Sequence, residues 1–364
     1  MRQNDSATAS SRLGPADDSG DCGHDLGDIA RRLTVHCAAY KGADTKRALI
    51  QLLDTAAPFM AFAIALILAI QHSIGLTLLL AVPTAGFLIR LFIIQHDCGH
   101  GSFFHSRAAN DLTGRLISIL TLTPYGHWRR SHAEHHASSG NLGRRGVGDI
   151  NTLTIREYLD LPAGGRLRYR LYRNPFILII IGAPIYFLLL QRFPFGAQLP
   201  FRQILSSIGS LDLAIAALYG TLFAFVGVQP VLMAFLPVAF IASWAAGWLF
   251  YVQHQFEDAY WEDSEDWDFH LAGLTGSSHY ALPRVLQWFT GNIGLHHIHH
   301  LCSRIPNYRL QECLDASPEL QQLGPRLTLL GSFKCVRLAL WDEDERKLVG
   351  FGHLRRPGPQ VQPA

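Results

Sequence analysis

Four long apolar runs dominate the sequence, at residues 52–70, 74–94, 209–228 and 231–252. A lipid bilayer has a hydrocarbon core about 30 Å thick, which a helix crosses with about 20 apolar residues. Each run is therefore long enough to span a membrane as a helix. Charged residues make up only 16% of the chain, well below the roughly 25% of ordinary soluble domains. We predict an all-α integral membrane protein with four transmembrane helices.

The distribution of basic residues predicts the topology. The two short connectors, residues 71–73 and 229–230, contain neither lysine nor arginine, whereas the flanks of the paired runs contain many. Basic residues are retained on the cytoplasmic side, so we expect two hairpins whose flanks, with both termini, face the cytoplasm. A fifth run, residues 176–190, is shorter and contains Pro184. A full crossing there would place the arginines that follow this run, Arg192 and Arg202, outside the cytoplasm. We therefore expect this run to re-enter the membrane or to lie at its interface.

The polar segments divide the chain into three parts. Residues 1–48 form a polar N-terminal tail without the pattern of a signal peptide, and we expect it to be partly disordered. Residues 49–320 form the membrane domain, and residues 321–364 form a cytoplasmic C-terminal tail with a disordered, proline-rich end. Six cysteines without a CxxC pair predict neither a disulfide framework nor a thiolate zinc site. The formal net charge of +2 gives no indication of a nucleic-acid partner.

Nine of the eighteen histidines form a pattern of one HxxxH box, two HxxHH boxes and a single histidine directly after the fourth run. These nine are His96, His100, His132, His135, His136, His254, His296, His299 and His300. Positions i, i+3 and i+4 share one face of a helix, so each box presents its imidazoles side by side, as a chelate requires. One metal ion takes at most about six ligands. Nine histidines therefore indicate two metals.

A single box is more often a solvated helix face, but three boxes on one side of a membrane protein predict a metal centre. Neutral imidazole binds iron, copper, nickel and zinc. A zinc hydrolase needs only one metal with three protein ligands, whereas two irons suit oxygen chemistry on an unactivated carbon, which must be shielded from water. An acyl chain entering from the membrane would meet that requirement. His297 points off the ligand face, and we expect it to pack in the interior or to support a ligand. His127, His270 and His279 lie near the boxes and are weaker candidates for contacts with a ligand or the substrate.

Four segments around these histidines resemble the membrane fatty acid desaturases: HDCGHGSFF (96–104), WRRSHAEHH (128–136), FYVQHQFED (250–258) and WFTGNIGLHHIHHLCSRIPNY (288–308). The resemblance covers about residues 50–320 and is greatest to the bacterial acyl-lipid desaturases of the omega-6, or delta-12, type. It implies a cytosolic helical cap that holds a non-haem di-iron centre, ligated by the eight box histidines, with His254 as a further ligand.

The resemblance also implies a reaction and partners. A lipid-linked fatty acyl chain, O2, two electrons and two protons would give a new cis double bond and two waters. The electrons would come from a separate ferredoxin-type or cytochrome-type carrier, because no HPGG haem-binding string occurs in the sequence. The location implied is the bacterial inner membrane, with the metal site facing the cytoplasm.

Residues near the boxes have weaker assignments. Asp97 and Glu134 could accept the second N–H of a ligand histidine, or they could be solvated carboxylates. Asn292 could hold an iron-bound water or cap a helix. A basic surface is formed by Arg129, Arg130, Arg144 and Arg145. It could bind an acidic electron carrier or lipid headgroups, but the general retention of basic residues on the cytoplasmic side explains it equally well.

Two alternative functions stay open at this point. A hydroxylase, a ketolase or a delta-9 desaturase would use the same boxes, and only the product separates them. A membrane metal carrier would place its coordinating groups near the bilayer midplane, but the four apolar runs contain no histidine, which disfavours it. The boxes predict neither the double-bond position nor the acyl carrier, whether glycerolipid, coenzyme A or acyl-carrier protein.

Overall fold

The computed structural model describes residues 21–146, 148–193 and 200–355. Four of its helices are long and apolar enough to cross a membrane: α2 (Thr45–Ala69), α3 (Ile74–His100), the continuous helix Phe201–Val226 and α11 (Val228–His254). The third of these consists of α9 (Phe201–Ile204), a π-helical turn η3 (Leu205–Gly209) and α10 (Ser210–Val226). The prediction of a mainly helical membrane protein with four apolar helices is confirmed.

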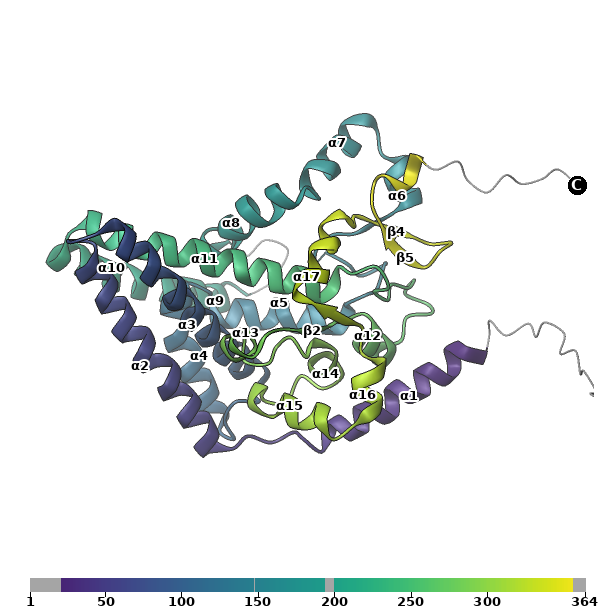
Figure 1. Ribbon diagram of the computed structural model, residues 1–364, viewed down its shortest axis with the longest axis horizontal. Coiled ribbons are helices and arrows are strands. Elements are labelled where there is room, and N and C mark those ends of the chain that lie inside the picture. The colour runs from purple at the N-terminus through teal and green to yellow at the C-terminus, as the bar shows by residue number, and fades with distance from the viewer. Residues whose placement is uncertain (1–20, 147, 194–199, 356–364) are drawn as a thin grey trace, which may run out of the picture.

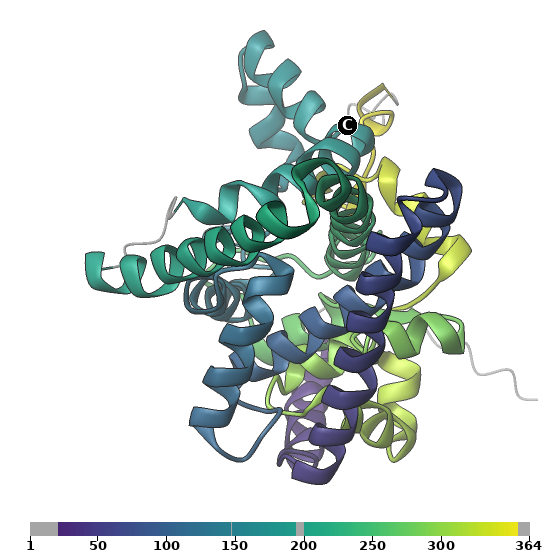
Figure 2. The same cartoon turned by 90° about the vertical axis from the view of Figure 1, so that its left-hand side faces the viewer.

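The long helices lie at one end of the molecule. They occupy the left half of Figure 1, with shorter elements to the right. α3 packs against α2, α4 (Arg107–Thr121) and α11, and it contributes Leu91 and Ile94 to the apolar core between them. Figure 2 shows α10 projecting away from α2, so the long helices splay apart. α3 is therefore the central helix, which connects the apolar end to the rest of the molecule.

Local chemistry sets where these helices begin and end. Asp44 caps α2 by accepting from the backbone N–H of Arg47, and Ser73 caps α3 in the same way. α3 ends at Gly101, whose φ of 67° is a left-handed conformation that glycine adopts without steric cost. Both α3 and α11 continue beyond their apolar runs, so that His100 and His254 are their last residues.

The fifth apolar run is part of a bent segment. α7 (Ala163–Tyr172) leads into the π-helix η1 (Phe176–Gly182), α8 (Ala183–Leu188) and the 3-10 turn η2 (Leu190–Arg192), with a bend of 57° after α7. η1 and α8 pack against α11. This geometry fits a broken span or a re-entrant loop, so the position of residues 176–190 in the membrane stays a prediction.

A cap of short elements covers the ends of α3 and α11. α5 (Tyr125–Ser138) packs on α3, and α1 (Asp21–Ala38) packs on α12 (Phe269–Thr275) and α14 (His296–Leu301). The other short helices are α6 (Ile155–Asp160), α13 (Arg284–Phe289), α15 (Asn307–Asp315), α16 (Pro318–Leu323), α17 (Leu329–Ser332), η4 (Phe333–Arg337) and η5 (His353–Arg355).

Short strands join distant segments of this cap. β1 (Leu153–Thr154) pairs in parallel with β4 (Leu340–Asp342), which pairs antiparallel with β5 (Lys347–Val349). β2 (His279–Ala281) pairs in parallel with β3 (Arg326–Thr328). The sequence did not predict these strands, because two or three residues are too few to show the alternation of a strand. The cap is therefore helical with small sheet additions.

The terminal segments are folded wherever the structure describes them. Leu340 and Leu348, from the expected C-terminal tail 321–364, are almost fully buried. α1 orders part of the expected N-terminal tail 1–48, with Leu33 and Cys37 buried against the cap. The expected disorder at the two ends concerns residues 1–20 and 356–364, which lie outside the described residues. The division into tails and a membrane domain 49–320 stays a prediction.

Candidate metal centre

Four helices bring the nine histidines of the sequence pattern to one place. α3 ends in His96 and His100, four residues apart on one face, and α11 ends in His254. The two HxxHH boxes lie on α5 and α14. Backbone hydrogen bonds tie α14 to the end of α11, since Ser278 donates to Gln253 O at 3.0 Å and accepts from His296 N at 3.2 Å. The structure brings together the helix faces that the box spacings indicate.

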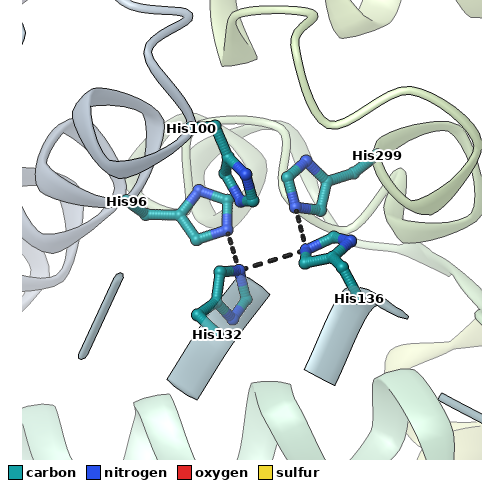
Figure 3. Close-up of side chains that lie close together, drawn as sticks. All are labelled: His96, His100, His132, His136 and His299. Carbon is teal, nitrogen blue, oxygen red and sulfur yellow. Dashed lines mark hydrogen bonds between the residues drawn. The ribbon is translucent and has the colours of Figure 1, made fainter. Parts of the chain in front are cut away.

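The nine histidines form two groups in which the ring nitrogens lie within 4.8 Å of one another. The first group comes from α3, α5 and α14 and comprises His96, His100, His132, His136 and His299; Figure 3 shows these five rings facing a common centre. The second group comes from α5, α11 and α14 and comprises His135, His254, His296 and His300. α5 and α14 contribute to both groups, so the two centres are neighbours.

The Nε2 atoms are the ones that meet in each group. In the first group, His132 Nε2 lies 3.0 Å from His96 Nε2 and 3.1 Å from His136 Nε2. In the second group, His254 Nε2 lies 3.2 Å from His135 Nε2 and 3.0 Å from His296 Nε2. Convergence of several lone-pair donors on one point is the arrangement that a metal ion requires.

Burial makes these imidazoles suitable ligands. Desolvation, and after it the neighbouring rings, lower the pKa of His132, His136 and His299 well below the usual 6.5. The same causes lower the pKa of the other histidines of the two boxes in the cap, His135, His296 and His300. Rings that stay neutral keep the lone pair with which imidazole binds a metal.

The residues present therefore fit a pair of transition-metal ions. His100 Nε2 and His300 Nε2 are buried and have no hydrogen-bond partner among the described residues. A buried polar atom without a partner is costly, and a metal bond would remove that cost. A set of neutral imidazoles suits iron, copper or zinc rather than magnesium or calcium, which prefer oxygen ligands.

Two of the nine histidine rings contact an acceptor through Nδ1, the ring nitrogen that faces away from the group. His96 Nδ1 lies 3.1 Å from Asp97 Oδ1, and His254 Nδ1 lies 3.2 Å from the carbonyl oxygen of Gly276. Each contact places the N–H on Nδ1 and leaves Nε2 free for a metal. Asp97 is almost fully buried, and its Oδ2 accepts from the backbone N–H and side-chain amide of Asn307 at 2.6 and 2.8 Å.

Asn307 was missed by the sequence analysis, although it lies in the segment IPNY that carries the family resemblance. Trp128 was missed in the same way. Its ring stacks on His132 with centroids 4.6 Å apart and an interplanar angle of 16°. Both residues belong to quoted motifs, which was the available signal, but a motif does not reveal which of its members touch the ligands.

Other candidate residues lie apart from the ring nitrogens. Glu134 faces Arg130 at 3.5 Å on the exposed side of α5, and the Asn292 amide donates to Asn307 O at 3.1 Å. His270 Nδ1 lies 2.9 Å from Thr34 Oγ1. His297 is fully buried outside both groups and stacks on His279; burial lowers the pKa of His297 to about 3. These contacts favour packing, capping or surface roles for all four.

A narrow apolar cavity of about 40 Å³ lies between α3, α8 and α11. Leu88, Phe92, Phe187 and Ala239 are among its lining residues. Phe92 precedes His96 by one helical turn, and its ring packs edge-on against Trp128. The cavity therefore approaches the first histidine group from the apolar end of the molecule.

The fold and this site define an integral membrane protein whose buried histidine groups could hold metal ions. The family model described as fatty acid desaturase matches residues 71–328. The chain is 45% identical to a fatty acid desaturase of Bacillus subtilis over 327 residues, which is 89% of this chain and 92% of that protein. The chain belongs to the fatty acid desaturase family, and it is an oxidoreductase of lipid metabolism.

More distant relatives have more specific names. An sn-1 oleoyl-lipid 12-desaturase of Synechocystis is 28% identical over 239 residues, covering 63% of this chain and 64% of the relative. An sn-2 acyl-lipid omega-3 desaturase (ferredoxin) of Arabidopsis thaliana is 28% identical, covering 62% of this chain and 52% of the relative. These names describe the relatives alone, and they differ in the position of the double bond.

Proposed function

We propose that this protein is an O2-dependent acyl-lipid desaturase of the omega-6, or delta-12, type, which inserts a cis double bond into a lipid-linked fatty acyl chain. The observation that carries the proposal is the pair of buried histidine groups at the C-terminal ends of α3 and α11. The apolar side chains that line the small cavity beside Phe92 favour an apolar substrate. The name of the Synechocystis relative supports the 12-position.

The nine histidines would hold two iron ions, five residues in one group and four in the other. Two such irons supply, when bound and reduced, the oxidising power to remove hydrogen from an unactivated carbon with O2. The protein residues orient and shield the site. Asp97 Oδ1 holds the proton of His96 at Nδ1, the Gly276 carbonyl does so for His254, and the apolar walls exclude water.

The partners and location follow from the same proposal. The electrons would come from a separate ferredoxin-type or cytochrome-type donor, for which the name of the Arabidopsis relative gives support. The metal site and both termini would face the cytoplasm of a bacterial inner membrane, because the basic flanks of the apolar helices lie on the histidine side.

The test is the fatty-acid profile of a bacterial host that makes no dienes, expressing this protein together with a ferredoxin and its reductase. Mass spectrometry that locates double bonds should find a new diene with its second bond toward the methyl end. A new monoene made from a saturated chain would contradict the omega-6 type, and a hydroxy acid would indicate a sibling oxygenase. Purified protein should contain about two iron ions per chain; protein without bound metal would contradict the ligand assignment.

A further inference from the structure

A polar cleft lies on the side of α3 away from the apolar cavity. It has a volume of about 720 Å³ and is lined by residues of α2, α3, α13 and α15. Successive residues of a helix are turned by about 100°, so Arg90, in this cleft, lies roughly opposite to Leu88 and Phe92, which line the apolar cavity. The cleft is therefore a separate site from the proposed acyl path.

The cleft carries one cation in excess. Three arginines line it, Arg47, Arg90 and Arg284. Arg47 pairs with Glu312 at 2.6 Å and Arg90 lies 4.0 Å from Asp54. Arg284 is exposed and has no ion-pair partner among the described residues. A guanidinium without a carboxylate in such a cleft is suited to a phosphate, with its flat array of N–H donors.

Arg90 is fixed in place although it lies on an apolar helix. Its guanidinium lies 3.9 Å from the centre of the Trp288 ring, and its Nε donates to Thr55 Oγ1 at 3.1 Å. Charged side chains within membrane-spanning helices mark functional sites or ion paths more often than simple packing. The cation–π contact orients the inner wall of the cleft before any ligand arrives.

The cleft also has a buried acceptor behind its wall and exposed apolar side chains beside it. Gln51 is 4% exposed, and its Oε1 has no hydrogen-bond partner among the described residues. Ile50 of α2, which lines the cleft, is 53% exposed, and Val285, next to Arg284 on α13, is 67% exposed. A ligand that fits would carry an anion and apolar chains.

We propose that this cleft binds the phosphate and headgroup of a membrane glycerophospholipid whose acyl chains lie along the exposed face of α2. The lipid is a resident ligand and not the chain that is desaturated, because the cleft and the apolar cavity lie on opposite sides of α3. Hydrogen bonds connect the wall of the cleft to the proposed metal centre. Gln51 Nε2 donates to Asn307 Oδ1 at 2.8 Å, and the Asn307 amide donates to Asp97, which contacts His96. The binding does not depend on which double bond the enzyme makes.

The test is native mass spectrometry of the full-length protein in detergent, without O2 turnover. The probes are dioleoyl phosphatidylglycerol and dioleoylglycerol, which share their acyl chains and differ in the phosphoglycerol group. Wild type should retain the phospholipid in preference to the diacylglycerol. Arg284→Gln should lower retention about fivefold, the effect of losing one interfacial arginine, whereas Arg284→Lys should keep most of it.

The matched control is Arg168→Gln, which removes an exposed arginine of α7 that has no ion-pair partner among the described residues. It should bind like wild type. Equal retention of both lipids by wild type, or equal loss in the two glutamine variants, would overturn the proposal. Displacement of the phospholipid by inorganic phosphate alone would also overturn it, by showing a site for a free anion. Because no turnover is measured, failure of the desaturase assignment would leave this result readable.

Discussion

At the scale of single residues, the proposed metal centre depends on buried imidazoles. Hydrophobic surroundings and neighbouring rings lower the pKa of the box histidines in the cap, so that no proton competes with a metal for the lone pairs. The sequence identified these residues because HxxxH and HxxHH spacings place rings on one helix face. It could not divide them into groups of five and four, because that division depends on how α5 lies between α3 and α14.

Removing one ligand from either group should abolish activity. We expect His299→Ala, in the first group, and His135→Ala, in the second, to lose detectable desaturation and to lower bound iron, while the apolar helices stay folded. The measurements are the fatty-acid profile, iron content and circular dichroism. His72→Ala is the matched control, since His72 is exposed on the short connector after α2. Full turnover by either ligand variant would refute the ligand assignment.

Asp97 should act by positioning His96. In the wild-type protein, His96 Nδ1 and the two N–H groups of Asn307 all donate to the Asp97 carboxylate. In Asp97→Asn one of the two oxygens becomes an NH2 group, which cannot accept, so either the contact with His96 or the contacts with Asn307 are lost. Loss of such a supporting contact typically lowers metal affinity about 10- to 100-fold. Competition with a chelator measures this affinity directly. Glu134→Gln is the control, because Glu134 faces Arg130 at the surface; an equal loss in both variants would contradict the positioning role.

At the scale of elements, the apolar runs predicted the helices well and the histidine-bearing ends less well. The run 74–94 became a helix that continues to His100, because nothing before Gly101 stops it. Hydropathy marks only the apolar part of the helix. The pairing of β1 with β4 could not be predicted, because it joins two segments of two and three residues that lie far apart in the sequence.

Close packing of α4 on α5 should position the second histidine box. A Cβ on Gly114 would lie 2.3 Å from the ring of Tyr125, and the Tyr125 hydroxyl donates to Cys98 O at 2.8 Å. Gly114→Ala must therefore displace the start of α5. We expect a loss of about 1–3 kcal/mol in the free energy of unfolding, the usual cost of overpacking, together with lower activity.

Thermal unfolding in detergent tests this packing. The control is Gly164→Ala on α7, where a Cβ would meet nothing within 4 Å. That change should be neutral or slightly stabilising, because alanine favours the helix. Similar melting temperatures for the two variants would show that α4 and α5 can separate without cost.

At the scale of the whole molecule, tertiary ion pairs neutralise most of the basic surface that the sequence predicts. Of the arginines predicted to form a basic surface, three have carboxylate partners: Arg129 with Asp111, Arg130 with Glu134 and Arg145 with Glu157. Arg144 has none among the described residues. Sequence shows charges but not their tertiary partners. A docking role for this surface stays a prediction, and any attraction of an acidic donor would be weaker than the sequence suggests.

The orientation of the molecule is testable with single cysteines and a maleimide that does not cross the inner membrane. The five cysteines whose side chains are described are buried, and Cys22 can be replaced by serine to give an unreactive background. His72 is exposed on the connector between α2 and α3, and Gln229 is exposed in the first turn of α11, so we expect His72→Cys and Gln229→Cys to react in intact spheroplasts. Asp266→Cys, on the exposed loop of the cap, should react only after permeabilisation. The opposite pattern would place the histidine groups outside the cytoplasm, where a soluble intracellular electron carrier could not reach them.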